Sequence, residues 1–339
     1  MSRVAVIGGG AWGTALAMVA GRHGGHQVRL WALEKEVCES VSQTRMNDLF
    51  LPGCALPDSV TPTNDFREAL EGAEIVVSVM PSHHCRRSFE HMAQWLRPEM
   101  LFVSATKGVE NDTLLRMTDV VSEVVERYCH FMPRITALSG PSFAREVAEG
   151  KPTAVTVASR DLALAGRVQR EFSDSSFRIY VNDDLIGVEL GGALKNVIAI
   201  AAGVCAGLGT GHNSVAALIT RGLAEITRLA VACGAKPQTM FGLAGIGDLV
   251  LTCTGGLSRN RSVGMALGQG QKLQDVISGM RGMVAEGVLT TNAAIGLAKK
   301  YGVEMPITEQ MYAILHDGKP ALEAVHELMA RPGKAEDRF

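Results

Sequence analysis

The segment VAVIGGGAWG at residues 4–13 constrains the fold most, because it joins a short apolar run to a turn of pattern Gly8-x-Gly10-x-x-Gly13. The apolar run is typical of a buried parallel strand, and the residues after Gly13 continue as a helix. Gly8 and Gly10 permit backbone angles and close approaches that a Cβ atom would block, while Gly13 lets the helix lie against the sheet. Free N–H groups at such a helix start face a pyrophosphate. The segment therefore predicts a dinucleotide site, against the alternative of an ordinary glycine-rich turn.

Further strand patterns alternate with helical patterns along the first half of the chain. They lie at residues 26–31, 73–80, 100–105, 135–139, 153–158 and 177–181. Such alternation predicts a doubly wound, mostly parallel sheet of the α/β class. Pro81 and the Thr106-Lys107-Gly108 run follow two of these strands. Because ligands bind at the carboxyl ends of parallel strands, both are candidate site positions.

The pattern changes at Asp184, where strand signals end and long helical stretches begin, notably at residues 185–204 and 214–233. This predicts a dinucleotide-binding domain at residues 1–183 and an all-α domain at residues 184–339.

Composition and charge exclude several other classes of protein. The formal net charge of −2 gives no bulk attraction to nucleic acid or to an anionic membrane. Seven dispersed cysteines without a C-x-x-C pair indicate reduced thiols, and the chain enters its first strand without a secretory pattern, so we expect a cytoplasmic protein. The apolar residues 190–208 contain Lys195 and Asn196, which favours a buried helix over a membrane span. His83 and His84 have no second ligand at metal-site spacing, so no metal is expected.

Lys195 stands out because the helix around it, GVELGGALKNVIAIAAG, is otherwise almost entirely apolar or small. Desolvation and a neighbouring cation would each lower the pKa of a lysine, which lets it exchange a proton near neutral pH. The alternative is a snorkelling or ion-paired lysine. Glu189, six residues earlier, lies on the wrong helix face to be its partner. The residue pattern alone leaves both interpretations open.

Asp248 is the single carboxylate after the glycine-rich run GLAGIG. It could orient a lysine ammonium, with Thr252 one turn further on the same face. Aspartate is also a favoured N-cap, and the sequence alone favours capping.

The tetrapeptide Ser258-Arg259-Asn260-Arg261 follows another glycine-rich loop. A guanidinium beside hydroxyl and amide donors suits a phosphate, which accepts several converging hydrogen bonds. The alternative is a solvated basic loop.

With these segments together, the chain closely resembles the bacterial type of NAD(P)-dependent glycerol-3-phosphate dehydrogenase. The resemblance rests on seven motifs: IGGGAWGTALA, SATKG, LSGPSFAREVAEG, GVELGGALKNVIAIAAG, GLAGIGDLVLTC, SRNRSVG and VAEGVLTT. It implies a Rossmann domain followed by a helical substrate domain, and reversible reduction of dihydroxyacetone phosphate to glycerol 3-phosphate for phospholipid synthesis. It also implies a homodimer.

The resemblance carries roles onto individual residues. Lys195 matches the proton donor to the ketone oxygen and the base in the reverse direction; Asp248 and Lys107 complete the catalytic set. A second ammonium at Lys107 would keep the pKa of Lys195 low and stabilise a developing alkoxide. The implied substrate contacts are Lys107, Gly140, Ser142, Lys195, Asn196, Asp248, Thr252, Ser258, Arg259 and Asn260. The implied cofactor contacts are Gly8, Gly10, Ala11, Trp12, Gly13, Lys107, Ala144, Arg259, Val284 and Glu286.

Cofactor preference depends on the residues after the second strand. The family commonly has a basic residue two positions past the tryptophan, whereas here Trp31-Ala32 is followed by Leu33-Glu34. A carboxylate there accepts from a ribose hydroxyl and repels a 2′-phosphate, which favours NAD over NADP, although Arg29 or Lys35 leaves NADP open.

Two rival functions are a related dehydrogenase for another hydroxy or keto acid and a non-catalytic dinucleotide sensor. The basic loop at residues 258–261 argues against the first, because it suits a phosphate. Lys107, Lys195 and Asp248 argue against the second.

Overall fold

The computed structural model describes residues 2–280, 285–333 and 335–336. The chain divides into two compact units, which are described separately. The first unit comprises Met1–Thr106 and Met117–Leu185, and the second comprises Lys107–Arg116 and Ile186–Phe339. The short stretch Lys107–Arg116 thus belongs with the second unit, although it lies within the first unit's sequence.

An eight-stranded sheet forms the centre of the first unit, in the order β10-β9-β8-β7-β6-β1-β2-β5. The strands are β1 (Arg3–Ile7), β2 (Gln27–Trp31), β5 (Val60–Thr63), β6 (Ile75–Ser78), β7 (Leu101–Ser104), β8 (Arg134–Ser139), β9 (Thr153–Ala158) and β10 (Phe177–Asn182). All neighbouring pairs are parallel except β8 and β9. The strand order reverses between β1 and β6, as in a Rossmann fold. The predicted α/β class with a mostly parallel sheet is confirmed.

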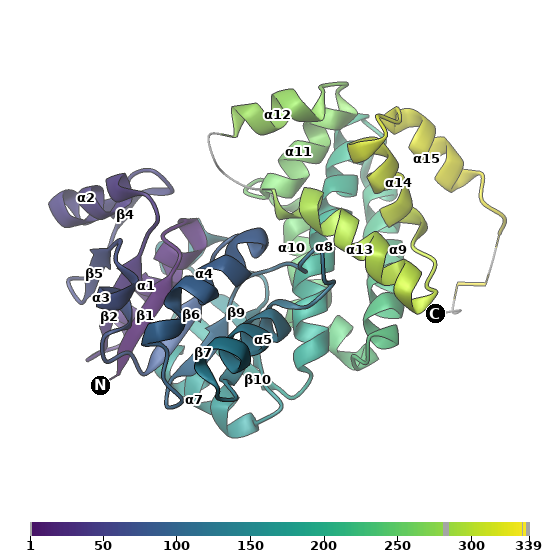
Figure 1. Cartoon of the computed structure of the whole chain (residues 1–339). Helices are drawn as coiled ribbons and strands as arrows, with labels where there is room; N and C mark the ends of the chain where they lie inside the picture. The colour runs from purple at the N-terminus through teal and green to yellow at the C-terminus, as the bar shows by residue number, and fades with distance from the viewer. Residues whose placement is uncertain (1, 281–284, 334, 337–339) are drawn as a thin grey trace. The chain divides into compact units, whose positions relative to one another are not determined.

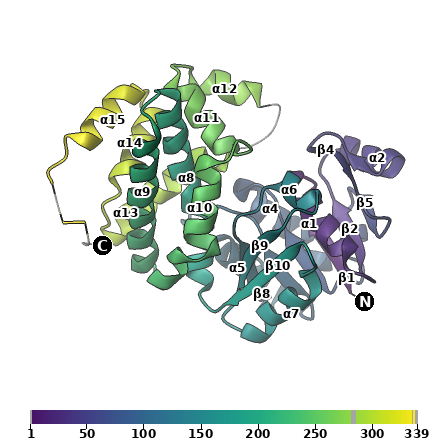
Figure 2. The same cartoon turned by 180° about the vertical axis from the view of Figure 1, so that it is seen from behind.

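Helices cover both faces of this sheet (Figures 1 and 2). On one face lie α1 (Ala11–Arg22), α6 (Ala144–Ala148) and α7 (Leu162–Phe172), and on the other lie α4 (Cys85–Met92) and α5 (Met117–Cys129). The shorter or peripheral elements are α2 (Lys35–Thr44), α3 (Phe66–Leu70), η1 (Ser82–His84) and η2 (Ala93–Trp95). Every residue of β1 from Val4 to Ile7 is buried, since alternate side chains point to opposite, covered faces.

The six strand segments predicted after the first one are confirmed to within two residues at each end. Three further strands were not predicted: β5 and the short antiparallel pair β3 (Met46–Asn47) and β4 (Leu51–Ala55). The sequences of β4 (LPGCA) and β5 (VTPT) contain proline or glycine, which weakens a strand signal, and β3 is only two residues long.

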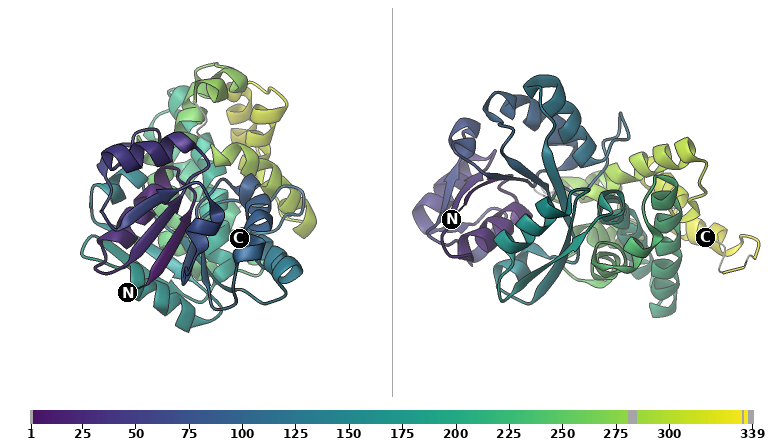
Figure 3. Two further views of the ribbon diagram at one scale, coloured as in Figure 1. Left: turned by 60° about the vertical axis from the view of Figure 1, so that its left-hand side comes forward. Right: turned by 90° about the horizontal axis from the view of Figure 1, so that it is seen from below.

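The described elements of the second unit after Leu185 are all helical, which confirms the predicted helical C-terminal region (Figure 3). They are α8 (Leu185–Gly207), α9 (His212–Ala232), η3 (Pro237–Phe241), η4 (Leu243–Gly247), α10 (Asp248–Thr254), α11 (Arg259–Gly268), α12 (Leu273–Gly279), α13 (Glu286–Tyr301), α14 (Pro306–His316) and α15 (Ala321–Met329). By length and composition α8 could cross a membrane, but its most apolar window is 94% buried within the protein. It is the core helix of this unit.

Close contact between α8 and α11 depends on glycine. A Cβ atom at Gly203 would lie 2.1 Å from the carbonyl oxygen of Arg261, and one at Gly264 would lie 1.9 Å from that of Ile200. Because both positions lack side chains, the two helices cross almost backbone to backbone. This packing brings the start of α11 beside the middle of α8, where Lys195 and Asn196 lie.

Candidate active site

The glycine turn between β1 and α1 has the geometry that its pattern predicts. Gly8 has a φ of +131°, and a Cβ there would lie 2.3 Å from the carbonyl oxygen of Val79. A Cβ at Gly13 would lie 1.8 Å from the carbonyl oxygen of Gly8. Packing within the protein therefore requires glycine at both positions. A Cβ at Gly10, in contrast, would meet no atom of the described chain within 4 Å.

The start of α1 leaves its backbone donors available. Its N-cap is Gly10, which has no side chain to cap the helix, and the first turn contains no acidic residue. The first N–H groups of a helix carry a partial positive charge and need acceptors. This cradle fits an anionic group such as a pyrophosphate.

Asn47 supports the same turn and was missed by sequence reasoning. Its side chain is fully buried, and its Nδ2 atom donates to the carbonyl oxygen of Gly9 at 2.7 Å and to Oγ1 of Thr14 at 2.8 Å. The Oδ1 atom accepts from the backbone N–H of Phe50 at 3.1 Å. Asn47 thus ties the glycine turn to the β3–β4 segment. No motif around Asn47 indicates this role, because the contact spans 38 residues of sequence.

The other cofactor and substrate candidates of the first unit lie at strand ends and helix starts. Ala11 and Trp12 open α1, Ala144 opens α6, and all three pack against the same core cluster. Gly140 follows β8 with a φ of +142°, and Ser142 donates from its Oγ atom to the carbonyl oxygen of Gly140 at 3.0 Å.

Three charged candidates meet in the second unit. Nζ of Lys195 lies 3.1 Å from Oδ1 of Asp248, and Nζ of Lys107 lies 2.7 Å from Oδ2 of the same carboxylate. Lys195 also donates to Oγ1 of Thr252 at 2.7 Å. Asp248 and Lys195 are buried, with exposed fractions of 2% and 5%, whereas the side chain of Lys107 retains 19%. One carboxylate therefore holds two ammonium groups, which leaves a net positive charge.

Burial lowers the pKa of Lys195 from its ordinary value to about 8. Desolvation is the largest cause; the charge of Asp248 opposes it, and the charge of Lys107 lowers the pKa further. A lysine in this range is mostly protonated at neutral pH yet can release its proton without a strong base. The arrangement can both donate a proton to a substrate oxygen and accept one from a hydroxyl.

The expectation that Asp248 caps α10 is wrong. An N-cap residue needs non-helical backbone angles, but Asp248 already has φ −71° and ψ −32°, and the π-helical turn η4 runs directly into it. Gly247, the residue before α10, also has helical backbone angles, with φ −60° and ψ −52°, and makes no side-chain cap. The carboxylate is consequently available to the two lysines. The predicted shared face with Thr252 is confirmed, since Oγ1 of Thr252 donates to the backbone carbonyl of Asp248 at 2.6 Å.

A chain of amides links the middle of α8 to the starts of α11 and α13. Nδ2 of Asn260 donates to Oδ1 of Asn196 at 3.0 Å, and Oδ1 of Asn260 accepts from the backbone N–H of Gly287 at 2.9 Å. Both amide orientations are fixed by these partners. Glu286 is the first residue of α13, whereas Val284 lies outside the described residues.

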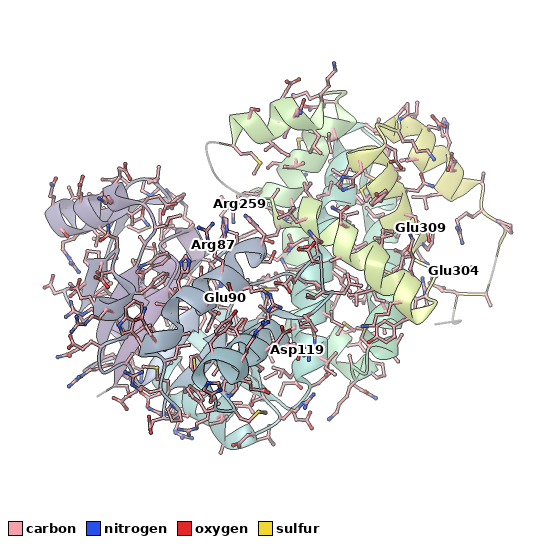
Figure 4. The ribbon with its side chains drawn as sticks, in the orientation of Figure 1. Arg87, Glu90, Asp119, Arg259, Glu304 and Glu309 are labelled. Atoms are coloured by element: carbon pink, nitrogen blue, oxygen red, sulfur yellow. The ribbon has the colours of Figure 1, made fainter. Side chains whose placement is uncertain are left out.

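The basic loop forms the first turn of α11. Ser258 is the N-cap, and its Oγ atom accepts from the backbone N–H of Arg261 at 3.2 Å. Arg259 follows as the first helical residue and is exposed. Figure 4 labels its side chain at the start of α11. The negative charge of Glu286 favours the charged form of this guanidinium. Arg259 thus stands between Ser258 and Asn260 in the first turn of α11.

Within the described ranges, no three His, Cys, Asp or Glu side chains gather as they would around a metal ion. His83 and His84 contact each other, with ring centroids 3.9 Å apart.

Comparison with protein families matches both halves of the chain. Residues 3–165 match the family described as the N-terminus of NAD-dependent glycerol-3-phosphate dehydrogenase, and residues 184–326 match its C-terminus.

Individual relatives extend these matches over the whole chain. A protein of Koribacter versatilis named glycerol-3-phosphate dehydrogenase, NAD(P)+, is 67% identical over 99% of both chains. One of the same name from Acidobacterium capsulatum is 56% identical over 99% of this chain and its own full length. The crystal structure of glycerol-3-phosphate dehydrogenase from Coxiella burnetii is 38% identical, with a TM-score of 0.91, and covers 97% of this chain and 99% of its own.

Proposed function

Because this chain belongs to the family of NAD(P)+-dependent glycerol-3-phosphate dehydrogenases and is an NAD(P)-dependent oxidoreductase, we propose that Lys195 is its acid and base. When bound, the reduced nicotinamide supplies the hydride for C2 of dihydroxyacetone phosphate. The ammonium of Lys195 delivers the proton to the C2 oxygen, which completes glycerol 3-phosphate. In the reverse direction the neutral amine takes the proton from the C2 hydroxyl. The burial of Lys195 against Asp248, with Nζ 3.1 Å from Oδ1, carries this proposal, and the lowered pKa supports it.

The neighbours of Lys195 prepare it for this role. Asp248 holds the ammonium from one side, and the hydroxyl of Thr252 accepts its second hydrogen bond. Lys107 adds a positive charge that stabilises negative charge developing on the C2 oxygen. The pair of lysines on one carboxylate favours an anionic transition state over a neutral ground state.

The substrate phosphate binds at the start of α11. Arg259 supplies a guanidinium that can contact two phosphate oxygens, and Ser258, Asn260 and Asn196 supply hydroxyl and amide groups nearby. Gly140 and Ser142 are further substrate contacts by resemblance to the family. Charge-assisted hydrogen bonds of this kind contribute about 1.5 to 3 kcal/mol each.

The glycine turn of the first unit holds the cofactor. Gly8 and Gly13 form the tight turn, and Gly10 leaves room for the pyrophosphate to reach the N–H groups of α1. The remaining cofactor contacts, taken from the family, are Ala11, Trp12, Lys107, Ala144, Arg259, Val284 and Glu286.

Cofactor choice is set at the end of β2. Leu33 is 68% exposed there, and Glu34 is the N-cap of α2, without a side-chain bond to that helix. Its carboxylate is suited to accept from the ribose hydroxyls of NAD. Arg29 lies 3.6 Å from Glu68 and shares its charge with that carboxylate, which weakens it as a 2′-phosphate ligand. We therefore expect a preference for NAD.

Initial rates with dihydroxyacetone phosphate, measured with NADH and NADPH in parallel, test the proposal. Faster turnover with NADH supports the role of Glu34, and a Glu34→Arg variant should shift the ratio toward NADPH. A wild-type preference for NADPH would contradict it. If neither cofactor supports turnover although both bind, a different substrate would be favoured.

The biological setting follows from the same family. The enzyme acts in the cytoplasm as a homodimer and supplies glycerol 3-phosphate for phospholipid synthesis. Light scattering of the purified protein measures the dimer directly, and a monomeric mass would exclude it.

A further inference from the structure

Residues 107–116, here called the arm, leave the sequence of the first unit between β7 and α5 and belong to the second unit. The arm is a compact reversal of the chain. Its Glu110 N–H donates to the carbonyl of Leu115, and its Leu114 N–H donates to the carbonyl of Glu110, each at 2.9 Å. An antiparallel bridge joins Val109 to Arg116. These contacts make the arm one folded element, so displacement at one end is transmitted to the other.

Apolar contacts fasten the arm to the helices of the second unit. Val109 is 2% exposed and belongs to the core cluster that surrounds α8, and Leu114 packs against the same cluster. Leu114 fits against α13 at Gly296, where a Cβ atom would lie 2.7 Å from the leucine Cδ2 atom. Leu114 has a φ of +59°, a left-handed conformation that is unfavourable for leucine. The apolar contacts of the arm with the second unit must offset this backbone strain, so these contacts hold the arm in the observed conformation.

A buried ion pair fixes the far end of the arm. Nη1 of Arg116 lies 2.7 Å from Oε2 of Glu189 on α8, and the two side chains are 12% and 5% exposed. At the near end, Nζ of Lys107 lies 2.7 Å from Oδ2 of Asp248. An ion pair therefore holds the arm at each of its ends. Only the near one involves the proposed catalytic group.

We propose that Arg116 and Glu189 are positioning residues, whose ion pair holds the arm so that the ammonium of Lys107 stays on Asp248 beside Lys195. The inference rests on the proposed function of Lys195. Neither Arg116 nor Glu189 takes part in proton transfer; they act through the placement of Lys107.

The charges around Lys195 determine how loosening of the arm changes the pKa of Lys195. Lys195 is influenced by Asp248 and Cys253 of α10 and by Lys107 of the arm. Loss of Lys107 removes the positive charge that lowers the pKa of Lys195, so this pKa rises and Asp248 orients Lys195 without a second ammonium from the arm. A purely structural role for the ion pair would instead lower stability and leave the protonation of Lys195 unchanged.

A double-mutant cycle distinguishes these cases. Glu189→Gln, Lys107→Met and the double variant are compared by kcat/KM for dihydroxyacetone phosphate across pH. We expect Lys107→Met to lower kcat/KM by about 100-fold and Glu189→Gln by about 10-fold, both with the pH midpoint displaced upward. In the double variant, Glu189→Gln should add nothing to Lys107→Met, because the arm then has no ammonium to place. The exchanged pair Arg116→Glu with Glu189→Arg should recover part of the lost activity.

A matched control is Glu225→Gln, which alters another buried carboxylate of this unit, bonded to the start of α14 rather than to the arm. It should leave the pH midpoint unchanged. If Glu189→Gln does not fold, Leu114→Ala replaces it in the same cycle, since it loosens the arm without uncovering a buried charge. Additive losses, or an unshifted midpoint in the arm variants, would overturn the positioning role. Full activity of Lys107→Met would instead contradict the role of Lys107 in the proposed function, and the positioning role with it.

Discussion

The ammonium nitrogen of Lys195 lies 3.1 Å from Oδ1 of Asp248, and both side chains are almost wholly buried. A buried ion pair is tolerated only where further hydrogen bonds satisfy its members, and here Thr252 and Lys107 do so. Two ammonium groups face one carboxylate, so the cluster keeps an excess positive charge. An anionic ligand or transition state would neutralise it.

Replacing the lysine at the centre of this cluster tests its catalytic role. Lys195→Ala should lower kcat for dihydroxyacetone phosphate by about 100-fold or more, because it removes the buried ammonium that is proposed to supply the proton. Binding of NADH, measured by fluorescence titration, should be unchanged. Lys299→Ala on the exposed side of α13 is the matched control and should retain activity. A near-normal kcat in Lys195→Ala would remove Lys195 from the mechanism.

The lowered pKa of Lys195 predicts opposite pH profiles for the two directions of reaction. Reduction of the ketone needs the protonated ammonium, so its kcat/KM should fall as pH rises through about 8. Oxidation of glycerol 3-phosphate needs the neutral amine, so its kcat/KM should rise through the same region. Rates measured in both directions between about pH 6 and about pH 10 check this. Profiles that share one sign would show that another group limits both reactions.

The guanidinium at the start of α11 should act on substrate binding rather than on chemistry. Arg259→Ala should raise KM for dihydroxyacetone phosphate by about 10- to 150-fold, equivalent to the loss of one charge-assisted contact. Dihydroxyacetone, which lacks the phosphate, serves as the internal control and should be used equally poorly by both proteins. An equal loss with the unphosphorylated ketone would contradict a phosphate contact.

Substitution of Asn47 should weaken cofactor binding and leave the chemical step unchanged. Removing its amide leaves the carbonyl of Gly9 with only the longer hydrogen bond from Oγ1 of Thr14 among the described residues, which should loosen the glycine turn. We expect Asn47→Ala to raise KM for NADH by about 5- to 30-fold, the loss of one or two buried hydrogen bonds, with kcat at saturating NADH little changed. Asn47→Asp retains the shape but not the donor and should resemble the alanine variant. If KM for NADH stays normal, the hydrogen bonds of the Asn47 side chain are not needed for cofactor binding.

Glu225 should make stability depend on pH. Burial raises the pKa of this carboxyl to about 7, against hydrogen bonds from the backbone of Ile307 and Thr308 that favour the charged form. A carboxyl whose pKa is raised on folding stabilises the native state while protonated, so its contribution is present below about pH 4.5 and is lost as pH rises through about 7. The change amounts to about 3 kcal/mol at most.

Thermal unfolding followed by circular dichroism between about pH 5 and about pH 8 measures this dependence. Glu225→Gln, which carries no titratable proton, should flatten the profile. A variant whose unfolding temperature varies with pH as strongly as that of the wild type would assign the dependence to another group.

Much of the fold follows from local signals in the sequence. Seven strands and the glycine turn before α1 were predictable because buried strands are continuous apolar runs and the turn needs glycine at Gly8 and Gly13. Lys195 was recognisable as a site candidate because a charge in a helix as apolar as α8 needs a partner. That partner could not be named from local sequence, since Asp248 lies 53 residues away.

What the sequence did not predict depends on long-range contacts. The capping interpretation of Asp248 failed because the π-helical turn before it extends the helix backward, and no residue pattern marks that turn. The arm was not recognised as part of the second unit, because Val109, Leu114 and Arg116 contact residues of α8 and α13 that are distant in the sequence. Asn47 escaped notice for the same reason.

The arm has a consequence for the way this protein can be divided. A fragment that starts at residue 184 includes Lys195 and Asp248 but lacks Lys107, which precedes that start by 77 residues. Fusing such a fragment to a foreign dinucleotide-binding domain would give a hybrid in which one of the two ammonium groups is missing. A working chimera of this enzyme therefore needs three junctions, two of them at the ends of the ten-residue insertion Lys107–Arg116.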